Sequence, residues 1–245
     1  MERITIHAVR AVDEPWTCAE FAIQHAKVLK DFGIETVAEQ GRWHRDNNIV
    51  VLWAEHAELG MVGGCRLHLA RTPGDRLPVE TSVGAMDPEV RRFIEDQLPS
   101  GVLEIGGLWN ANRFGGRGIP HVLVMAGIAM ASNLNANTVI GVAAKYTLRY
   151  ALRLGLHVVE RVGEKGWFDY PKPGFYGILT GTTNAIAMDG ARLDLRKRIL
   201  SLRYKPMQRC IENTGTALLD IQYLLSLSNN VERSSVLWPT LRHSA

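Results

Sequence analysis

Apolar and polar residues alternate in several short segments of the chain, which is the pattern of strands that bury one face. The clearest example is RITIHAVR at residues 3–10. Other segments repeat their apolar residues every three or four positions, as amphipathic helices do. Strands are predicted over residues 3–10, 49–55, 61–69, 102–109, 138–143, 156–162 and 175–183. Helices are predicted over residues 89–98, 120–134, 145–154 and 217–227. A further helix is predicted to begin at a cap, either Asp13 or Thr17, and to end at residue 32.

The order of these elements predicts the fold class. Strands 49–55 and 61–69 are joined by a link of hairpin length that ends in Gly60, so they should pair antiparallel. After an insertion at 71–101, residues 102–162 run strand, glycine loop, helix, strand, helix, strand, which predicts a crossover between two parallel strands. We therefore expect a mixed α/β (α+β) fold, with a mostly antiparallel twisted sheet, a central parallel strand pair and flanking helices.

The length and composition allow one large core with an appendage. The chain has 245 residues, of which 46% are hydrophobic. Residues 1–185 are predicted to form the α/β domain, and residues 186–245 a helical C-terminal extension. Basic residues cluster between 192 and 209; they could dock an acidic carrier protein, but a solvated helix face is the favoured interpretation. The apolar residues of 217–227 could line an acyl pocket, although core packing is the favoured interpretation.

The charge, the cysteines and the hydropathy narrow the class of protein. A net charge of +3 is too small to predict nucleic-acid binding, and would suit a phosphate-bearing ligand or an acidic partner. Three scattered cysteines predict reduced thiols in a cytoplasmic protein, and eight histidines without ligand spacing predict no metal site. The most apolar stretch, 122–131, is about half as long as the roughly 20 residues of a membrane helix, so no integral membrane contact is expected.

The strongest chemical signal is a glycine loop between a predicted strand and a predicted helix. Backbone N–H groups can converge on a pyrophosphate only where side chains do not obstruct the turn, and the following helix adds its N-terminal donors and dipole. A glycine-rich turn without a ligand is the alternative; a dinucleotide-binding loop is rejected, because this loop follows four strands. The loop has the pattern R-x-x-G-x-G and consists of Arg113, Phe114, Gly115, Gly116, Arg117 and Gly118, whose two arginines could add charge-assisted bonds.

Two features of the strand before this loop also indicate chemistry. Gly106 and Gly107 predict a bulge that would separate this strand from strand 138–143 and could admit a thin pantetheine arm; simple backbone crowding is the alternative. Glu104 could deprotonate an amine acceptor, either directly or through water. Its alternative role is a structural ion pair with an arginine.

With RFGGRG between strand and helix, residues 3–183 resemble the GNAT superfamily of acyltransferases. Within it, they look most like the autoinducer (acyl-homoserine lactone) synthases and the N-acyl amino acid synthases. Those enzymes have a G-x-x-R-L strand, a long insertion, and then a strand with a Glu. GGCRL at 63–67 matches the first strand and VLEI at 102–105 the second, while YTLRYALRLGL at 146–156 looks like their next helix.

The resemblance implies an acyl thioester of phosphopantetheine as co-substrate, either acyl-CoA or an acyl carrier protein (acyl-ACP). It implies a small-molecule amine as acceptor and an N-acyl product, with a fatty acyl group in the closest families. By position, Glu104 and Arg66 match residues that line the acceptor site, and Asp46 is the candidate for an upstream acid. Tyr146 or Tyr150 is the candidate general acid, because Ala151 occupies the position where many acetyltransferases have a tyrosine.

One departure from the pattern bears on the acceptor. Autoinducer synthases continue the Glu strand as W-E-x-S-R-F, whereas this chain reads LEIGGL, with Gly107 in place of the arginine. This difference weakens the case for S-adenosylmethionine as acceptor. We expect an N-acyltransferase that works by direct attack of the amine, with Glu104 as the base. The alternatives are an ordinary acetyl-CoA N-acetyltransferase, an acyl-homoserine lactone synthase and a non-catalytic acyl-CoA sensor.

Overall fold

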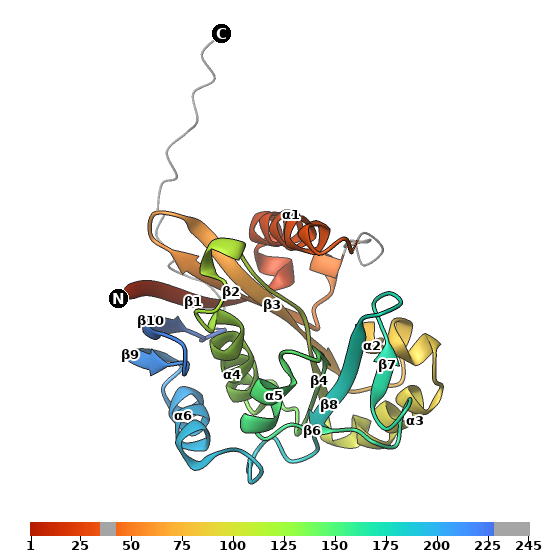
Figure 1. The fold of residues 1–245 in the computed structure, drawn as a ribbon. Helices are drawn as coiled ribbons and strands as arrows, with labels where there is room; N and C mark the ends of the chain where they lie inside the picture. The colour runs from red at the N-terminus through yellow and green to blue at the C-terminus, as the bar shows by residue number, and fades with distance from the viewer. Residues whose placement is uncertain (35–42, 228–245) are drawn as a thin grey trace.

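The computed structural model describes residues 1–34 and 43–227, and its strands form one ten-stranded sheet (Figure 1). The strand order is β6-β8-β5-β4-β3-β2-β1-β10-β9, with β7 paired to β8. Pairings β4–β5 and β1–β10 are parallel and the others are antiparallel. The strands are β1 (Glu2–Arg10), β2 (Ile49–His56), β3 (Gly60–Ala70), β4 (Val102–Asn110), β5 (Thr138–Ala144), β6 (His157–Val158), β7 (Trp167–Asp169), β8 (Tyr176–Thr182), β9 (Met207–Asn213) and β10 (Leu218–Leu224).

Helices cover both faces of the sheet. A Cβ placed on Gly63 would lie 3.0 Å from the Ile119 side chain of α4, whereas one on Gly64 would lie 2.6 Å from Phe21 of α1. Because neighbouring residues of a strand point to opposite faces, α4 and α1 lie on opposite sides of β3. The helices are α1 (Pro15–Asp31), α2 (Pro78–Thr81), α3 (Glu89–Gln97), α4 (Ile119–Ala131), α5 (Leu148–Arg153) and α6 (Leu193–Tyr204).

The main core lies between α4, α6 and the sheet. Nearly every residue of α4 is buried, which agrees with its almost uniformly apolar sequence IPHVLVMAGIAMA. A second cluster packs the insertion, with Phe93 and Ile94 of α3, against the β8 end of the sheet. The mixed α/β class, the mostly antiparallel sheet and the central parallel pair are as predicted.

The C-terminal part departs from its prediction. The predicted helix 217–227 is wrong: Leu218–Leu224 forms β10, which inserts between β1 and β9. Leu219, Ile221 and Tyr223 are fully buried on the inner face of the sheet. They lie two residues apart, as side chains on one face of a strand do. Among the described residues of the predicted extension, 186–227, α6 is the one helix, and strands on both sides of residue 185 belong to the same sheet.

Other boundaries differ in smaller ways. The predicted strand 156–162 shortens to β6, since only His157 and Val158 pair with β8. The insertion carries α2 as well as the predicted helix α3. Residues 35–42 lie outside the described residues, and Trp43–Arg45 forms a single 3-10 turn.

The central parallel pair separates where the glycines predicted it would. Strands β4 and β5 pair at three positions, ending with Glu104 opposite Ile140, although both strands continue. On the other side of β4, its register against β3 shifts between Gly64 and Arg66, and Gly107 has a left-handed φ of +56°. The predicted bulge and the separation of the strands are therefore confirmed.

Candidate active site

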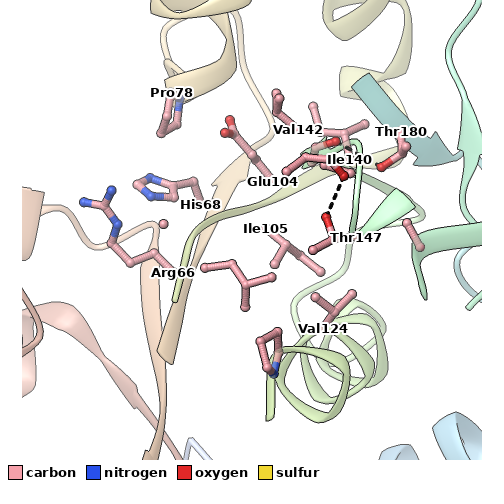
Figure 2. A pocket seen from close by; sticks show the side chains of 18 of the residues that line it. Arg66, His68, Pro78, Glu104, Ile105, Val124, Ile140, Val142, Thr147 and Thr180 are labelled. Atoms are coloured by element: carbon pink, nitrogen blue, oxygen red, sulfur yellow. Dashed lines mark hydrogen bonds between the residues drawn. The ribbon is translucent and has the colours of Figure 1, made fainter. Parts of the chain in front are cut away.

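A cavity of about 920 Å³ passes through the sheet at this separation. Leu67 and Ile105 pack toward Gly127 of α4, so their strand neighbours Arg66, His68 and Glu104 point to the opposite face. Residues from both faces line the same cavity, including Val124 of α4 on one side and Glu104 on the other. Figure 2 shows this arrangement, with Glu104 and Val124 on opposite sides of β4.

The α4 end of the cavity begins at the predicted glycine loop. Gly116 and Gly118 line it, and both have the left-handed backbone that favours glycine, with φ of +73° and +80°. Gly118 is the N-cap of α4, and Pro120 occupies the first turn. The unpaired N–H groups and the positive dipole end of α4 therefore point toward this end of the cavity.

The C-terminal hairpin supports the glycine loop from outside the cavity. A Cβ on Gly118 would lie 2.3 Å from Cβ of Thr214, in the turn between β9 and β10. The Thr214 hydroxyl donates a hydrogen bond to the carbonyl of Arg117 at 3.1 Å. The part of the chain after residue 185 therefore helps to shape the predicted donor site.

The other loop residues contact the protein itself. The Arg113 guanidinium donates to the carbonyl of Leu59 at 2.8 Å, and Arg117 pairs with the carboxylate of Glu2. Phe114 is buried in the main core, while Gly115 accommodates the turn. Participation of the two arginines in phosphate binding stays a prediction.

Glu104 lies at the other end of the cavity and has an unusual environment. Its side chain is buried, and burial raises the pKa of the carboxyl from 4.5 to about 7. A hydrogen bond of 2.9 Å from the backbone N–H of Val79 to Oε2 and the charge of Arg66 act in the opposite direction. A carboxylate that titrates near neutrality can both accept and release a proton under physiological conditions.

Arg66 and His68 extend from β3 beside Glu104. The Arg66 guanidinium lies 4.8 Å from the centre of the Trp43 ring. A Cβ on Gly107 would lie 3.1 Å from Arg66 Nε, so a longer side chain at position 107 would collide with this guanidinium. Asp46 also lines the cavity, so Glu104, Arg66 and Asp46 border one space, and their role at an acceptor site stays a prediction.

The two candidate tyrosines line the cavity near α5. Tyr146 precedes the helix and is 71% exposed. The hydroxyl of Tyr150 accepts a hydrogen bond of 2.7 Å from Arg149, and its ring centre lies 5.8 Å from that of His121. Tyr150 therefore has the more fixed hydroxyl of the two.

His121, Tyr170 and His68 also line the cavity, and neither of the two histidines was predicted from the sequence as a site residue. His121 is buried in the first turn of α4, where burial lowers its pKa. Tyr170 follows β7, and burial raises the pKa of its phenol. His68 is opposite Glu104 in the β3–β4 ladder. His68 could have been predicted from the sequence, because a residue two positions after Arg66 in a strand lies on the same face of the sheet.

The described residues contain neither a metal-binding cluster nor a helix that could span a membrane. Within residues 1–34 and 43–227, no group of three His, Cys, Asp or Glu side chains is placed to hold a metal ion. No helix of the described part of the chain combines the length and the apolar character needed to cross a bilayer.

Comparison with known proteins identifies the fold. No protein-family model and no curated protein matches the sequence. Among solved structures, the N-acyl amino acid synthase FeeM from uncultured soil microbes superposes with a TM-score of 0.59 at 10% identity, over 80% of this chain and 99% of FeeM. TofI in a ternary complex with an inhibitor and MTA has a TM-score of 0.55 at 16% identity, over 80% of this chain and 96% of TofI.

An acyl-CoA N-acyltransferase from Pseudomonas aeruginosa extends the similarity. It has a TM-score of 0.52 at 16% identity, over 73% of this chain and 98% of its own. The topology of the sheet, the separated parallel pair and the glycine loop before α4 are the features that the sequence resemblance had predicted. The chain thus has the fold of the GNAT acyltransferases, shared with the N-acyl amino acid and acyl-homoserine lactone synthases.

Proposed function

We propose that this protein is an N-acyltransferase that moves an acyl group longer than acetyl from a phosphopantetheine thioester to a small-molecule amine. The observation that carries the proposal is the continuous cavity between the N-terminus of α4 and the buried Glu104. A thioester in this cavity would have its phosphates at one face of the sheet and its carbonyl near the base at the other. The fold similarity to acyltransferases supports the same reaction class.

The donor end favours a phosphorylated carrier. The helix dipole and the N–H groups at Gly116 and Gly118 suit a pyrophosphate, and the separation of β4 from β5 suits an unbranched arm. We propose acyl-CoA as the donor, with acyl-ACP as the alternative.

The acyl group would extend into an apolar part of the cavity. Part of the cavity lining is aliphatic, and a volume of about 920 Å³ lies near the upper end of the roughly 300–1,000 Å³ of small-molecule sites. Such a volume exceeds what an acetyl group and its arm require, and therefore favours a longer chain. The aliphatic residues of the lining include Leu77, Ile140, Val142, Leu108 and Val124.

The reaction requires two proton losses from the amine. The acceptor arrives as an ammonium, and the Glu104 carboxylate removes one proton to expose the nitrogen lone pair. The amine then attacks the thioester carbonyl carbon, the new C–N bond forms and the C–S bond breaks. The second N–H proton passes to solvent, Tyr150 is the proposed donor that protonates the thiolate, and solvent returns a proton to Tyr150. The products are an N-acyl amide and a free thiol, and no acyl-enzyme is needed.

The test combines binding and turnover. Purified full-length protein is mixed with acetyl-CoA, octanoyl-CoA or palmitoyl-CoA and with glycine, leucine, ethanolamine or ethylamine, and free thiol and amide products are measured by mass spectrometry. We expect tighter binding of the longer thioesters and an N-acyl product that depends on the amine. Binding without any product would support a sensor. Failure to bind either acyl-CoA or acyl-ACP would overturn the proposal.

A further inference from the structure

His68 is a buried imidazole that the mechanism above does not use. Its side chain is about 6% exposed, it lines the cavity, and its Nε2 atom has no hydrogen-bond partner among the described residues. An unsatisfied buried nitrogen costs stability unless a ligand or water completes it. A polar group that enters the cavity would satisfy Nε2 after a small shift of the ring, since this atom has less than 1 Å² of accessible surface.

The register of the sheet places this nitrogen next to the proposed base. His68 pairs with Glu104 across the β3–β4 ladder, so the two side chains are neighbours on one face. The next residue of β4 on that face is Gly106, and a Cβ there would lie 3.3 Å from Oε1 of Glu104. Since the Val79 N–H is bonded to Oε2, Oε1 is the carboxylate oxygen that borders the space above Gly106.

We propose that the space above Gly106 is the amine pocket, and that His68 is a positioning residue that accepts a hydrogen bond from the acceptor ammonium while Glu104 accepts another. This inference rests on the proposed function and specifies how the amine is recognised. A primary ammonium can satisfy both groups and keep a third N–H, whereas a tertiary ammonium cannot. The site therefore selects acceptors with an unhindered primary amine.

The electrostatics separate the two roles. Burial and the Arg66 charge lower the pKa of His68 to about 3, so the ring stays neutral where Glu104 titrates. A neutral ring with such a weak basicity orients the ammonium but does not take its proton. The other groups that act on this pair are Arg66 on β3, Glu80 on α2 and Tyr170 after β7. Both Glu80 oxygens already accept hydrogen bonds, from Arg76 and from the backbone N–H of Leu77.

The direct test is NMR of protein labelled with ¹⁵N-histidine, alone and with the unreactive thioether S-octyl-CoA. His68 is assigned by comparison with His68→Gln, and ethylammonium is then added. We expect Nε2 to be unprotonated and its resonance to shift on ethylammonium addition, whereas that of the exposed His157 does not. A protonated Nε2, or no shift at saturating ethylammonium in either state, overturns the proposal. Failure of S-octyl-CoA to bind would instead count against the proposed function.

Kinetics give an independent readout with octanoyl-CoA and ethylamine. Loss of one hydrogen bond to a charged group predicts a rise of about 10- to 100-fold in the amine KM of His68→Leu, with the octanoyl-CoA KM unchanged. His68→Gln retains an acceptor oxygen and should recover most of the loss. The rise of activity near pH 7 should persist in His68→Leu; its disappearance would make His68 the base and overturn the assignment. An unchanged amine KM would also overturn it.

Discussion

The backbone N–H of Val79 donates a hydrogen bond of 2.9 Å to the carboxylate of Glu104. Val79 belongs to the insertion between β3 and β4, so this bond ties a segment outside the sheet to the proposed base. The bond fixes one carboxylate oxygen and leaves the other toward the cavity. The insertion therefore orients Glu104 as well as burying it.

Glu104→Gln tests whether this carboxyl is the base. Because glutamine cannot accept the ammonium proton, kcat/KM should fall by a factor on the order of 10²–10⁴, with acyl-CoA affinity unchanged. In the wild-type protein kcat/KM should rise with pH through an apparent pKa of about 7, the value to which burial raises Glu104. The measurement is a pH profile of thiol release. A variant that keeps wild-type activity and its pH dependence would exclude Glu104 as the base.

The same substitution should change the pH dependence of stability. Between pH 4.5 and about 7 the folded chain retains a proton on Glu104 that the unfolded chain has released. The free energy of unfolding therefore falls as pH rises through this window, by up to about 3 kcal/mol. Glutamine can still accept the Val79 hydrogen bond but carries no charge to bury. Urea unfolding should find Glu104→Gln more stable than wild type at about pH 8 and equal to it at about pH 4; equal stability at both pH values would contradict the burial effect.

Much of the sheet and some of the candidate site residues could be predicted from the sequence. The Gly106–Gly107 pair predicted the separation of β4 from β5, because an interrupted ladder has a local cause in the strand that carries it. Glu104 and Arg66 followed from their positions in a resembling family. The glycine loop could also be predicted from local pattern, because its tight turn requires glycine at positions that are close together in the sequence.

The rest depended on contacts between distant segments. The sequence LLDIQYL at residues 218–224 is compatible with a helix or a strand. It forms a strand because β1 offers a free edge with which it pairs in parallel. The support of Gly118 by Thr214 and of Glu104 by Val79 joins residues far apart in the chain. The pairing of Arg117 with Glu2 also joins distant residues, and the RFGGRG pattern alone could not predict it.

Tyr150→Phe and Tyr146→Phe distinguish the two candidate general acids. The Tyr150 hydroxyl accepts a hydrogen bond from Arg149, which directs its own proton elsewhere, whereas Tyr146 is 71% exposed. If Tyr150 protonates the thiolate, its phenylalanine variant should lower kcat by a factor on the order of 10², and Tyr146→Phe should change it less than about two-fold. Single-turnover thiol release measures both. Equal kcat values for the two variants and wild type would leave solvent as the proton source.

Gly116→Ala and Gly118→Ala form a matched pair that separates backbone strain from steric support of the donor loop. Both positions have left-handed φ, +73° and +80°, which costs alanine about 1 kcal/mol. A Cβ at Gly116 meets no atom within 4 Å, whereas one at Gly118 would lie 2.3 Å from Cβ of Thr214.

Gly118→Ala should therefore lower the free energy of unfolding by about 2–4 kcal/mol, against about 1 kcal/mol for Gly116→Ala, because overpacking adds to the strain. The double variant Gly118→Ala with Thr214→Ser removes one methyl group from the collision but keeps the hydroxyl that bonds to Arg117. It should recover part of the lost stability in urea unfolding and part of the lost octanoyl-CoA affinity. Equal losses in the two single variants would show that the hairpin does not hold the loop, and that backbone conformation alone shapes this end of the cavity.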